Sequence, residues 1–214
     1  MDNAWMIAIC AVIGYLIGSV NVSVIVSILA YKSDIRKHGS GNAGATNMAR
    51  VYGVVGGIVV LIGDFGKAIL AMAIALAIGG ESVGHSCMLA AGVATVIGHA
   101  YPLYFRFKGG KGVTVGAAIA LMIDYRLLLI IFCVFVLLFL IRRIVSLSSV
   151  GACGSLIVAS VGFYAFQLTD LWSMITCVVI SVFVIFLHRS NIARLLKGEE
   201  KEFSFKRKSG RNDS

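Results

Sequence analysis

Three polar segments of this 214-residue chain combine glycine, amide, hydroxyl and basic side chains in a way that suits phosphate binding. The first segment, residues 38–50, reads HGSGNAGATNMAR. Glycine lets backbone N–H groups converge on an anion, and Arg50 offers a two-pronged donor to phosphate. From composition alone, the segment is also consistent with a flexible loop that ends in a helix cap at Thr46 or Asn47.

The second segment, residues 107–114, reads FKGGKGVT and places two lysines among three glycines at the start of an apolar stretch. If that stretch is helical, its N-terminus supplies N–H groups and a partial positive charge that suit a phosphate. The spacing does not match a Walker A motif, because Phe105 stands where the first glycine belongs and Gly112 follows Lys111. The segment therefore does not imply a nucleotide, and a basic loop that only orients the chain in a membrane remains the alternative.

The third segment, residues 188–199, reads HRSNIARLLKGE. In a helix, His188, Asn191 and Arg194 would share one face. That face could meet a polar ligand, or the segment could be an ordinary amphipathic helix at a membrane surface.

Few other charged or hydroxyl residues stand out. Asp64 and Lys67 interrupt an apolar stretch, where charges are costly and usually face a polar cavity, although at this spacing they could simply pair with each other. His85 and His99 are interpreted as boundary or packing residues, and the serines within 142–149 as helix caps. The five cysteines are scattered through apolar runs, and their spacing predicts neither a zinc site nor a redox pair.

Composition places these segments in a membrane protein. Hydrophobic residues make up 59% of the chain, charged residues 14%, and the mean hydropathy is +0.94, whereas soluble domains carry nearly twice that charged fraction. The net charge of +9 would suggest nucleic acid in a soluble domain, but beside apolar spans it more often sets topology. We expect one all-α integral membrane domain over residues 1–200, followed by a basic polar tail over residues 201–214.

Charge also decides how many times the chain crosses the bilayer, which takes about 20 apolar residues per helix. The candidate spans are residues 4–30, 53–79, 85–105, 113–123, 127–141, 150–166 and 171–187. The fourth is short and could instead be re-entrant. If it crosses, 17 of the 19 Lys and Arg residues belong to segments on one side; if it does not, they divide between both sides. The positive-inside rule therefore predicts seven transmembrane helices, with the N-terminus outside and the C-terminus in the cytoplasm.

At these residues the chain resembles the bacterial acyl-phosphate:glycerol-3-phosphate acyltransferases, the PlsY family. The resemblance covers nearly the whole chain, and the order and spacing of its motifs make it specific. The motifs are residues 39–47, 63–67, 98–102, 107–112, 146–149 and 188–199. It implies a seven-helix enzyme of the bacterial cytoplasmic (inner) membrane, with its active site facing the cytoplasm. The implied reaction transfers a fatty acyl group from acyl-phosphate to the 1-hydroxyl of glycerol 3-phosphate, giving lysophosphatidic acid and phosphate as the first acylation step of phospholipid synthesis.

The resemblance also implies site residues. The expected catalytic residues are Ser40, Asn42, Thr46, Lys111 and His188. The expected substrate-binding residues are Gly41, Gly44, Asn47, Arg50, Lys108, Gly109, Gly110, Gly112, Ser148, Asn191 and Arg194. Because acyl-phosphate is already activated, the substrate hydroxyl can attack it directly, so catalysis can rest on positioning and on neutralising phosphate charge. Either His188 or the substrate's own phosphate would take the proton.

No metal and no cofactor are expected, and nucleic acid is not an expected partner. The expected partners are acyl-phosphate, glycerol 3-phosphate, membrane lipid and the enzyme that makes the acyl-phosphate. A small-anion transporter or a lipid-binding scaffold would also explain the basic loops. A transporter explains less well why the polar motifs all fall on one side of the membrane, with few polar residues along the outer half of the spans.

Overall fold

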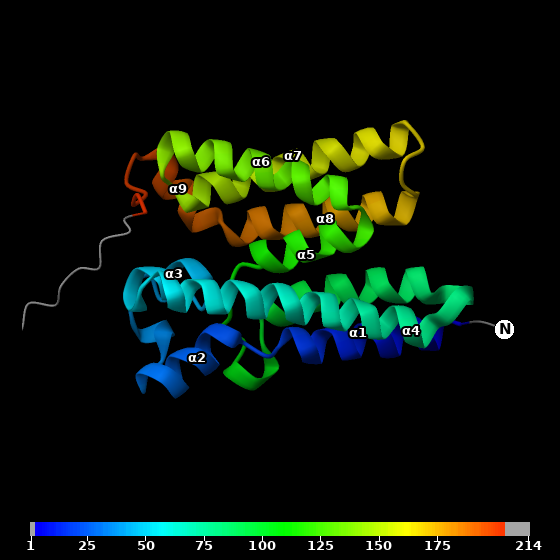
Figure 1. Cartoon of the computed structure of the whole chain (residues 1–214), viewed down its shortest axis with the longest axis horizontal. Helices are drawn as coiled ribbons and strands as arrows, with labels where there is room; N and C mark the ends of the chain where they lie inside the picture. Colours follow the sequence, from blue (N-terminus) through cyan, green and yellow to red (C-terminus); the bar gives the residue numbers. More distant parts are fainter. Residues whose placement is uncertain (1–2, 204–214) are drawn as a thin grey trace, which may run out of the picture.

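The computed structural model describes residues 3–203, and every regular element in that range is a helix (Figure 1). The longer helices are α1 (Ala4–Gly18), α2 (Val22–Tyr31), α3 (Ala45–Tyr52), α4 (Val54–Ala100), α5 (Val113–Ile123), α6 (Tyr125–Arg142), α7 (Val145–Ala165), α8 (Leu171–Leu187) and α9 (Arg189–Leu196). Four segments of the described chain are long and apolar enough to cross a membrane, and a fifth qualifies if the bent pair of α8 and α9 counts as one span. The all-α prediction is confirmed.

α4 folds back on itself as a helical hairpin. Gly80 interrupts it with φ 55° and ψ −151°, a conformation open to glycine because it has no Cβ. Residues on the two sides of this turn meet across the hairpin: Met72 lies against Gly92, and Asp64 lies 3.5 Å from His99. Figure 1 shows the two arms side by side, so this one element supplies two antiparallel helices.

Glycine also allows α1 to lie directly on the second arm of α4. Gly14 and Gly18, four residues apart, face Ala91 and Thr95 so closely that a Cβ on either glycine would overlap the opposing backbone. The Thr95 hydroxyl donates a hydrogen bond to the Gly14 carbonyl at 3.0 Å. Small residues at this spacing let membrane helices approach closely. This contact fixes the register of the second arm, whose end carries the glycine-rich loop.

The first apolar stretch is interrupted between α1 and α2. Asn21 accepts a hydrogen bond from the Val24 N–H at 3.0 Å and so begins the second helix. The Val20 carbonyl within the break accepts a hydrogen bond from Lys67 Nζ at 2.7 Å. Backbone groups freed inside an apolar layer require such a partner, so the break depends on a charged residue of α4.

The serines of segment 142–149 lie inside α7. Ile144 is the N-cap, and the hydroxyls of Ser148 and Ser149 donate to the carbonyls of Ile144 and Val145 at 3.1 and 2.8 Å. The prediction that these serines cap the helix is wrong. A serine inside a helix can satisfy its hydroxyl on the carbonyl four residues back, so the helix begins earlier than its apolar run suggests.

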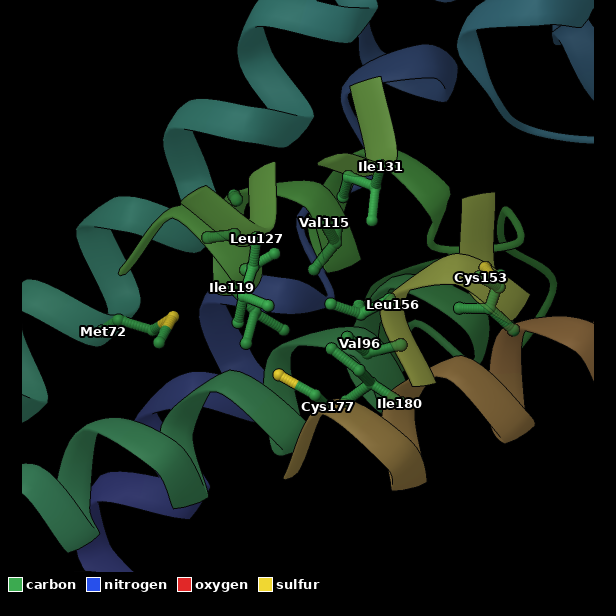
Figure 2. Close-up of a cluster of buried hydrophobic side chains, with 14 of the residues drawn as sticks. Met72, Val96, Val115, Ile119, Leu127, Ile131, Cys153, Leu156, Cys177 and Ile180 are labelled. Carbon is green, nitrogen blue, oxygen red and sulfur yellow. The ribbon is translucent and has the colours of Figure 1, made fainter. Parts of the chain in front are cut away.

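The interior of the larger helical group is built around α5. Met72, Ile119, Leu127, Leu156 and Ile180 pack together from α4, α5, α6, α7 and α8 (Figure 2). Ile119 is fully buried in this cluster. The short α5 therefore lies at the centre of this cluster, and the lysine-containing loop directly precedes its N-terminus.

The two ends of the bundle differ in character. α3, α9 and the end of α2 gather at one end, together with the polar motifs, while the α4 turn and the α7–α8 connection lie at the other (Figure 1). Trp5, Tyr125 and Trp172 begin α1, α6 and α8, and at least 60% of each is exposed. Along the sides, Val55 and Val158 are about three-quarters exposed, an apolar surface suited to lipid.

Candidate active site

A cavity of about 1410 Å³ brings the three predicted motifs together from positions up to 150 residues apart. Most of the predicted site residues border it, namely Ser40, Gly41, Asn42, Gly44, Thr46, Asn47, Arg50, Lys111, Gly112, His188, Asn191 and Arg194. Lys108, Gly109, Gly110 and Ser148 do not.

The Asn47 side chain fixes the conformation of the first motif by hydrogen bonds to the motif's backbone. Its side-chain oxygen accepts from the Ser40 N–H at 2.9 Å, and its amide donates to the carbonyls of His38 and Asn42, both at 3.0 Å. Asn47 is 1% exposed, and these bonds use most of the bonding capacity of an amide. Asn47 therefore shapes the loop, while the side chains of Ser40, Asn42 and Thr46 form no hydrogen bond within residues 3–203 and remain available to a ligand.

Arg36 holds the second motif from outside. Its Nη1 donates to the Phe105 carbonyl at 2.7 Å and to the Lys108 carbonyl at 3.3 Å, while Asp34 binds the other edge of the guanidinium. The side chain of Lys108 points away from the cavity and is exposed. Because the Arg36 fork joins two separated segments, it fixes where the glycine-rich loop starts.

The glycines of the second motif let the loop lie against the end of α4. The N–H groups of Gly109 and Gly110 donate to the carbonyls of Ala100 and His99, each at 3.1 Å. A Cβ on Gly109 would overlap the His99 carbonyl, and a Cβ on Gly110 would overlap the His99 imidazole. The N–H groups of Gly109 and Gly110 are therefore used in hydrogen bonds within the protein. By contrast, no side chain caps the N-terminus of α5 at Gly112, and the first residues of α5 border the cavity.

A network of hydrogen bonds between charged and polar side chains lines part of the cavity. Lys111 Nζ donates to the side-chain oxygen Oδ1 of Asn191, and the side-chain Nδ2 of Asn191 donates to Glu200 at 2.6 Å. Ser146 and Arg194 also donate to Glu200, at 2.7 and 2.6 Å. Burial raises the pKa of the Glu200 carboxyl, but these donors outweigh it and the pKa is lowered. An anionic group thus already lies among the cationic and amide donors.

Two titratable groups of the cavity have shifted pKa values. Burial lowers the pKa of Lys111 to about 8, although the Glu200 carboxylate opposes the fall. Burial also lowers the pKa of His188 to about 4, against the effect of its bond to the Val184 carbonyl at 2.8 Å. Since that carbonyl can only accept, Nδ1 of His188 carries the proton and Nε2 is left as an acceptor. At neutral pH the site therefore presents a cationic lysine and a neutral histidine.

Much of the rest of the cavity is apolar, although Asp64, His99 and Ser181 also border it. Its wall continues along the helices through Leu61, Phe65, Leu128, Leu129, Ile131, Phe132, Phe135, Ala152, Cys153, Leu156 and Ile180. Leu129 and Phe132 are more than half exposed on the side of the bundle, so the apolar part opens where lipid would lie. A cavity with a cationic end and an apolar extension suits an amphipathic molecule with an anionic head group.

Comparisons with known proteins agree on one family. The glycerol-3-phosphate acyltransferase family matches residues 8–198. The chain is similar to the glycerol-3-phosphate acyltransferase of Bacillus subtilis, with 37% identity over 91% of this chain and 96% of the relative. It is similar also to that of Finegoldia magna, with 35% identity over 92% and 96%. The chain belongs to the glycerol-3-phosphate acyltransferase family.

Solved structures of this acyltransferase family share the fold. The chain is similar to the crystal structure of PlsY, an integral membrane glycerol 3-phosphate acyltransferase, in its glycerol 3-phosphate form, with TM-score 0.82, 34% identity, and coverage of 92% of this chain and 96% of that one. The lysophosphatidic acid form gives TM-score 0.80 and 32% identity over 93% and 96%. The predicted family is confirmed, and the protein is a multi-pass membrane acyltransferase.

Several residues at this acyltransferase's cavity were not predicted from the sequence. Ser146 and Ser149 border it in place of Ser148, because residues three apart share a helix face and Ser148, two positions after Ser146, does not lie on that face. Glu200 enters the network from the end of the third motif, and its only signal was an acidic pair in a basic segment. His99 borders the cavity although it was interpreted as a packing residue.

Proposed function

We propose that this acyltransferase moves a fatty acyl group from acyl-phosphate to the 1-hydroxyl of glycerol 3-phosphate and releases lysophosphatidic acid and phosphate. The observation that carries the proposal is the single cavity that joins a cationic polar end to an apolar extension. Both substrates bear a phosphate and one bears an acyl chain, so the cavity has the chemistry that each part needs. The relatives' names supply the acceptor, and the motif resemblance supplies the donor.

The side chains that border the cavity form two groups, one for each substrate. Ser40, Asn42 and Thr46 have free donors on one wall and would orient the acyl-phosphate. Lys111 and the N-terminus of α5, with Gly112, would neutralise its phosphate. Arg50, Arg194, Asn191 and His188 would hold glycerol 3-phosphate, with Ser146 and Ser149 taking the part first expected of Ser148. The apolar wall would take the acyl chain.

In the proposed reaction the 1-hydroxyl oxygen bonds to the acyl carbon, and the bond from that carbon to the phosphate oxygen breaks. The electron pair leaves with inorganic phosphate, so no covalent enzyme intermediate is needed. The hydroxyl proton passes to His188 Nε2 or to a substrate phosphate oxygen. A pKa near 4 makes His188 a weak base before substrate binds, but an incoming phosphate dianion stabilises the protonated ring and raises that pKa.

We also propose that the enzyme crosses the bacterial inner membrane seven times, with the active site facing the cytoplasm. The turn at Gly80 divides α4 into two crossings, and α5 would make a short one beside the cavity. The motif loops carry most of the Lys and Arg residues, and positive loops stay in the cytoplasm. Exposed Trp5 and Trp172 at the opposite end suit a membrane interface.

The proposed domain division keeps residues 1–200 as the membrane domain and 201–214 as a tail. Residues 204–214 lie outside the described part of the chain. Just before them, the Phe203 N–H donates to the Arg143 carbonyl at 2.7 Å, and the Phe203 ring lies 6.1 Å from that of Phe139. This contact holds the first residues of the tail against the membrane domain.

The proposed reaction can be tested with protein purified in detergent, palmitoyl-phosphate and glycerol 3-phosphate. We expect equal amounts of phosphate and lysophosphatidic acid, and little of either when glycerol 3-phosphate is omitted. Lys111→Ala should lose most activity, whereas His85→Asn, an exposed histidine at the opposite end of the bundle, should keep it. Wild-type protein that releases no phosphate, or that uses only an acyl thioester, would refute the proposal.

A further inference from the structure

A buried charged cluster lies beneath the glycine-rich loop, and the proposed mechanism does not use it. Asp64 and Lys67 come from the first arm of α4 and His99 from the second, and none of their side chains is more than 7% exposed. Lys67 Nζ lies 2.8 Å from Asp64 Oδ1, 3.1 Å from His99 Nδ1 and 2.7 Å from the Val20 carbonyl. The contacts with His99 and Val20 are hydrogen bonds, and the contact with Asp64 is an ion pair.

These contacts determine which nitrogen of His99 carries its proton. An ammonium group paired with a carboxylate has only donors to offer, so His99 Nδ1 must accept. In the neutral imidazole the proton then resides on Nε2. No residue within 3–203 accepts a hydrogen bond from His99 Nε2, although His99 is 4% exposed and borders the cavity. This donor is therefore available to an acceptor that a ligand brings into the cavity.

Gly110 leaves the space in front of this donor open. A Cβ built on Gly110 would overlap His99 Nε2, so any larger residue would cover the N–H. The next residues along the chain, Lys111 and Gly112, border the cavity and are the groups assigned to a substrate phosphate. An oxygen held near Lys111 would therefore lie in the same cavity that His99 borders.

We propose that His99 Nε2–H is a further hydrogen-bond donor to an anionic substrate oxygen at the glycine-rich loop, and that Lys67 and Asp64 are positioning residues that fix its tautomer. The identity of the oxygen rests on the proposed function. It belongs to the phosphate of either substrate or to the acyl oxygen that gains charge in the transition state. His99 then contributes directly to binding or catalysis, and the buried ion pair acts through it.

Two substitutions of His99 separate a donor to substrate from a packing residue. The amide nitrogen of Gln can occupy the place of Nε2, whereas the amide of Asn reaches only the place of Nδ1. We expect His99→Gln to stay within about threefold of wild-type kcat/KM, and His99→Asn to lose roughly 10- to 150-fold, as for a hydrogen bond to a charged group. If His99 acted only through the contact of Nδ1 with Lys67, Asn would replace it better than Gln. A higher kcat/KM for His99→Asn than for His99→Gln would therefore overturn the proposal.

The kinetic constants identify the oxygen. A raised KM for one substrate in His99→Asn assigns the donor to that substrate's phosphate, and a lowered kcat with unchanged KM values assigns it to the transition state. His85→Asn is the matched control, since that ring is half exposed at the far end of the bundle. Thermal unfolding of each variant establishes that activity is compared between folded proteins.

A spectroscopic measurement on the wild-type protein is independent of turnover. In wild-type protein labelled with ¹⁵N-histidine, His99 should have an unprotonated Nδ1 and a protonated Nε2, and inorganic phosphate should shift the Nε2 resonance. Lys67→Met should lose the single tautomer. A proton on Nδ1 would overturn the proposal, and no response to saturating phosphate would exclude the substrate phosphates and leave the acyl oxygen as the acceptor. Wild-type protein that binds phosphate in this way but performs no acyl transfer would instead refute the proposed function alone.

Discussion

Deprotonation of Lys111 should weaken substrate capture within a pH range that is easily reached. Burial lowers the pKa of this lysine to about 8, and only its charged form attracts phosphate. As pH rises through 8 the charge is lost, so kcat/KM, which reports ionisations of the free enzyme, should fall. The protonated fraction drops from about nine-tenths at pH 7 to about one-tenth at pH 9, which predicts a roughly tenfold loss of kcat/KM.

The assay is initial phosphate release at subsaturating glycerol 3-phosphate, measured from pH 6.5 to 9.5 and corrected for hydrolysis of palmitoyl-phosphate without enzyme. Lys111→Arg is the control, because an arginine keeps its charge throughout this range. Its activity should be lower, since its planar head group cannot reproduce the bond to Asn191, but it should lack the alkaline decline. A wild-type profile that stays flat to pH 9.5, or an equal decline in Lys111→Arg, would refute the assignment.

Three further substitutions test the architecture of the site and the bundle. Ser146→Ala removes a bond to the partly buried Glu200 carboxylate and should lower kcat/KM roughly tenfold, more than Ser148→Ala. The reverse order in the same assay would contradict the assignment of Ser146 to the cavity face of α7. Asn47→Ala leaves partly buried backbone groups of its loop unpaired and should cost about 1 kcal/mol of stability and raise both KM values, measured by thermal unfolding and kinetics. Gly18→Val would overlap the α4 backbone and should lower the unfolding temperature, whereas Gly162→Ala, which has open space around it, should not; equal temperatures for the two variants would argue against the α1–α4 contact.

The sequence by itself determined the features that depend on local composition. The runs of apolar residues predict membrane helices, because a helix makes all the hydrogen bonds of its backbone N–H and C=O groups within one segment, without water. The three motifs indicate phosphate binding by their residue types, such as Lys111 between glycines or Asn191 and Arg194 three apart. This is readable from the sequence because the covalent structure of each side chain fixes its hydrogen-bond donors. Their order along the chain indicated the family, which the comparisons confirm.

Only the tertiary structure decided what each of these residues contacts. Asn47 looks in sequence like a substrate ligand, yet its amide is engaged by its own loop. Ser146 rather than Ser148 faces the cavity because helix phase, set by packing, selects one side of α7. The His99 ring contacts Lys67, which lies 32 residues away in the sequence, and lies against Gly110 of the glycine-rich loop. Such contacts join residues distant in sequence, so their geometry exists only once α1, both arms of α4 and α5 have packed together.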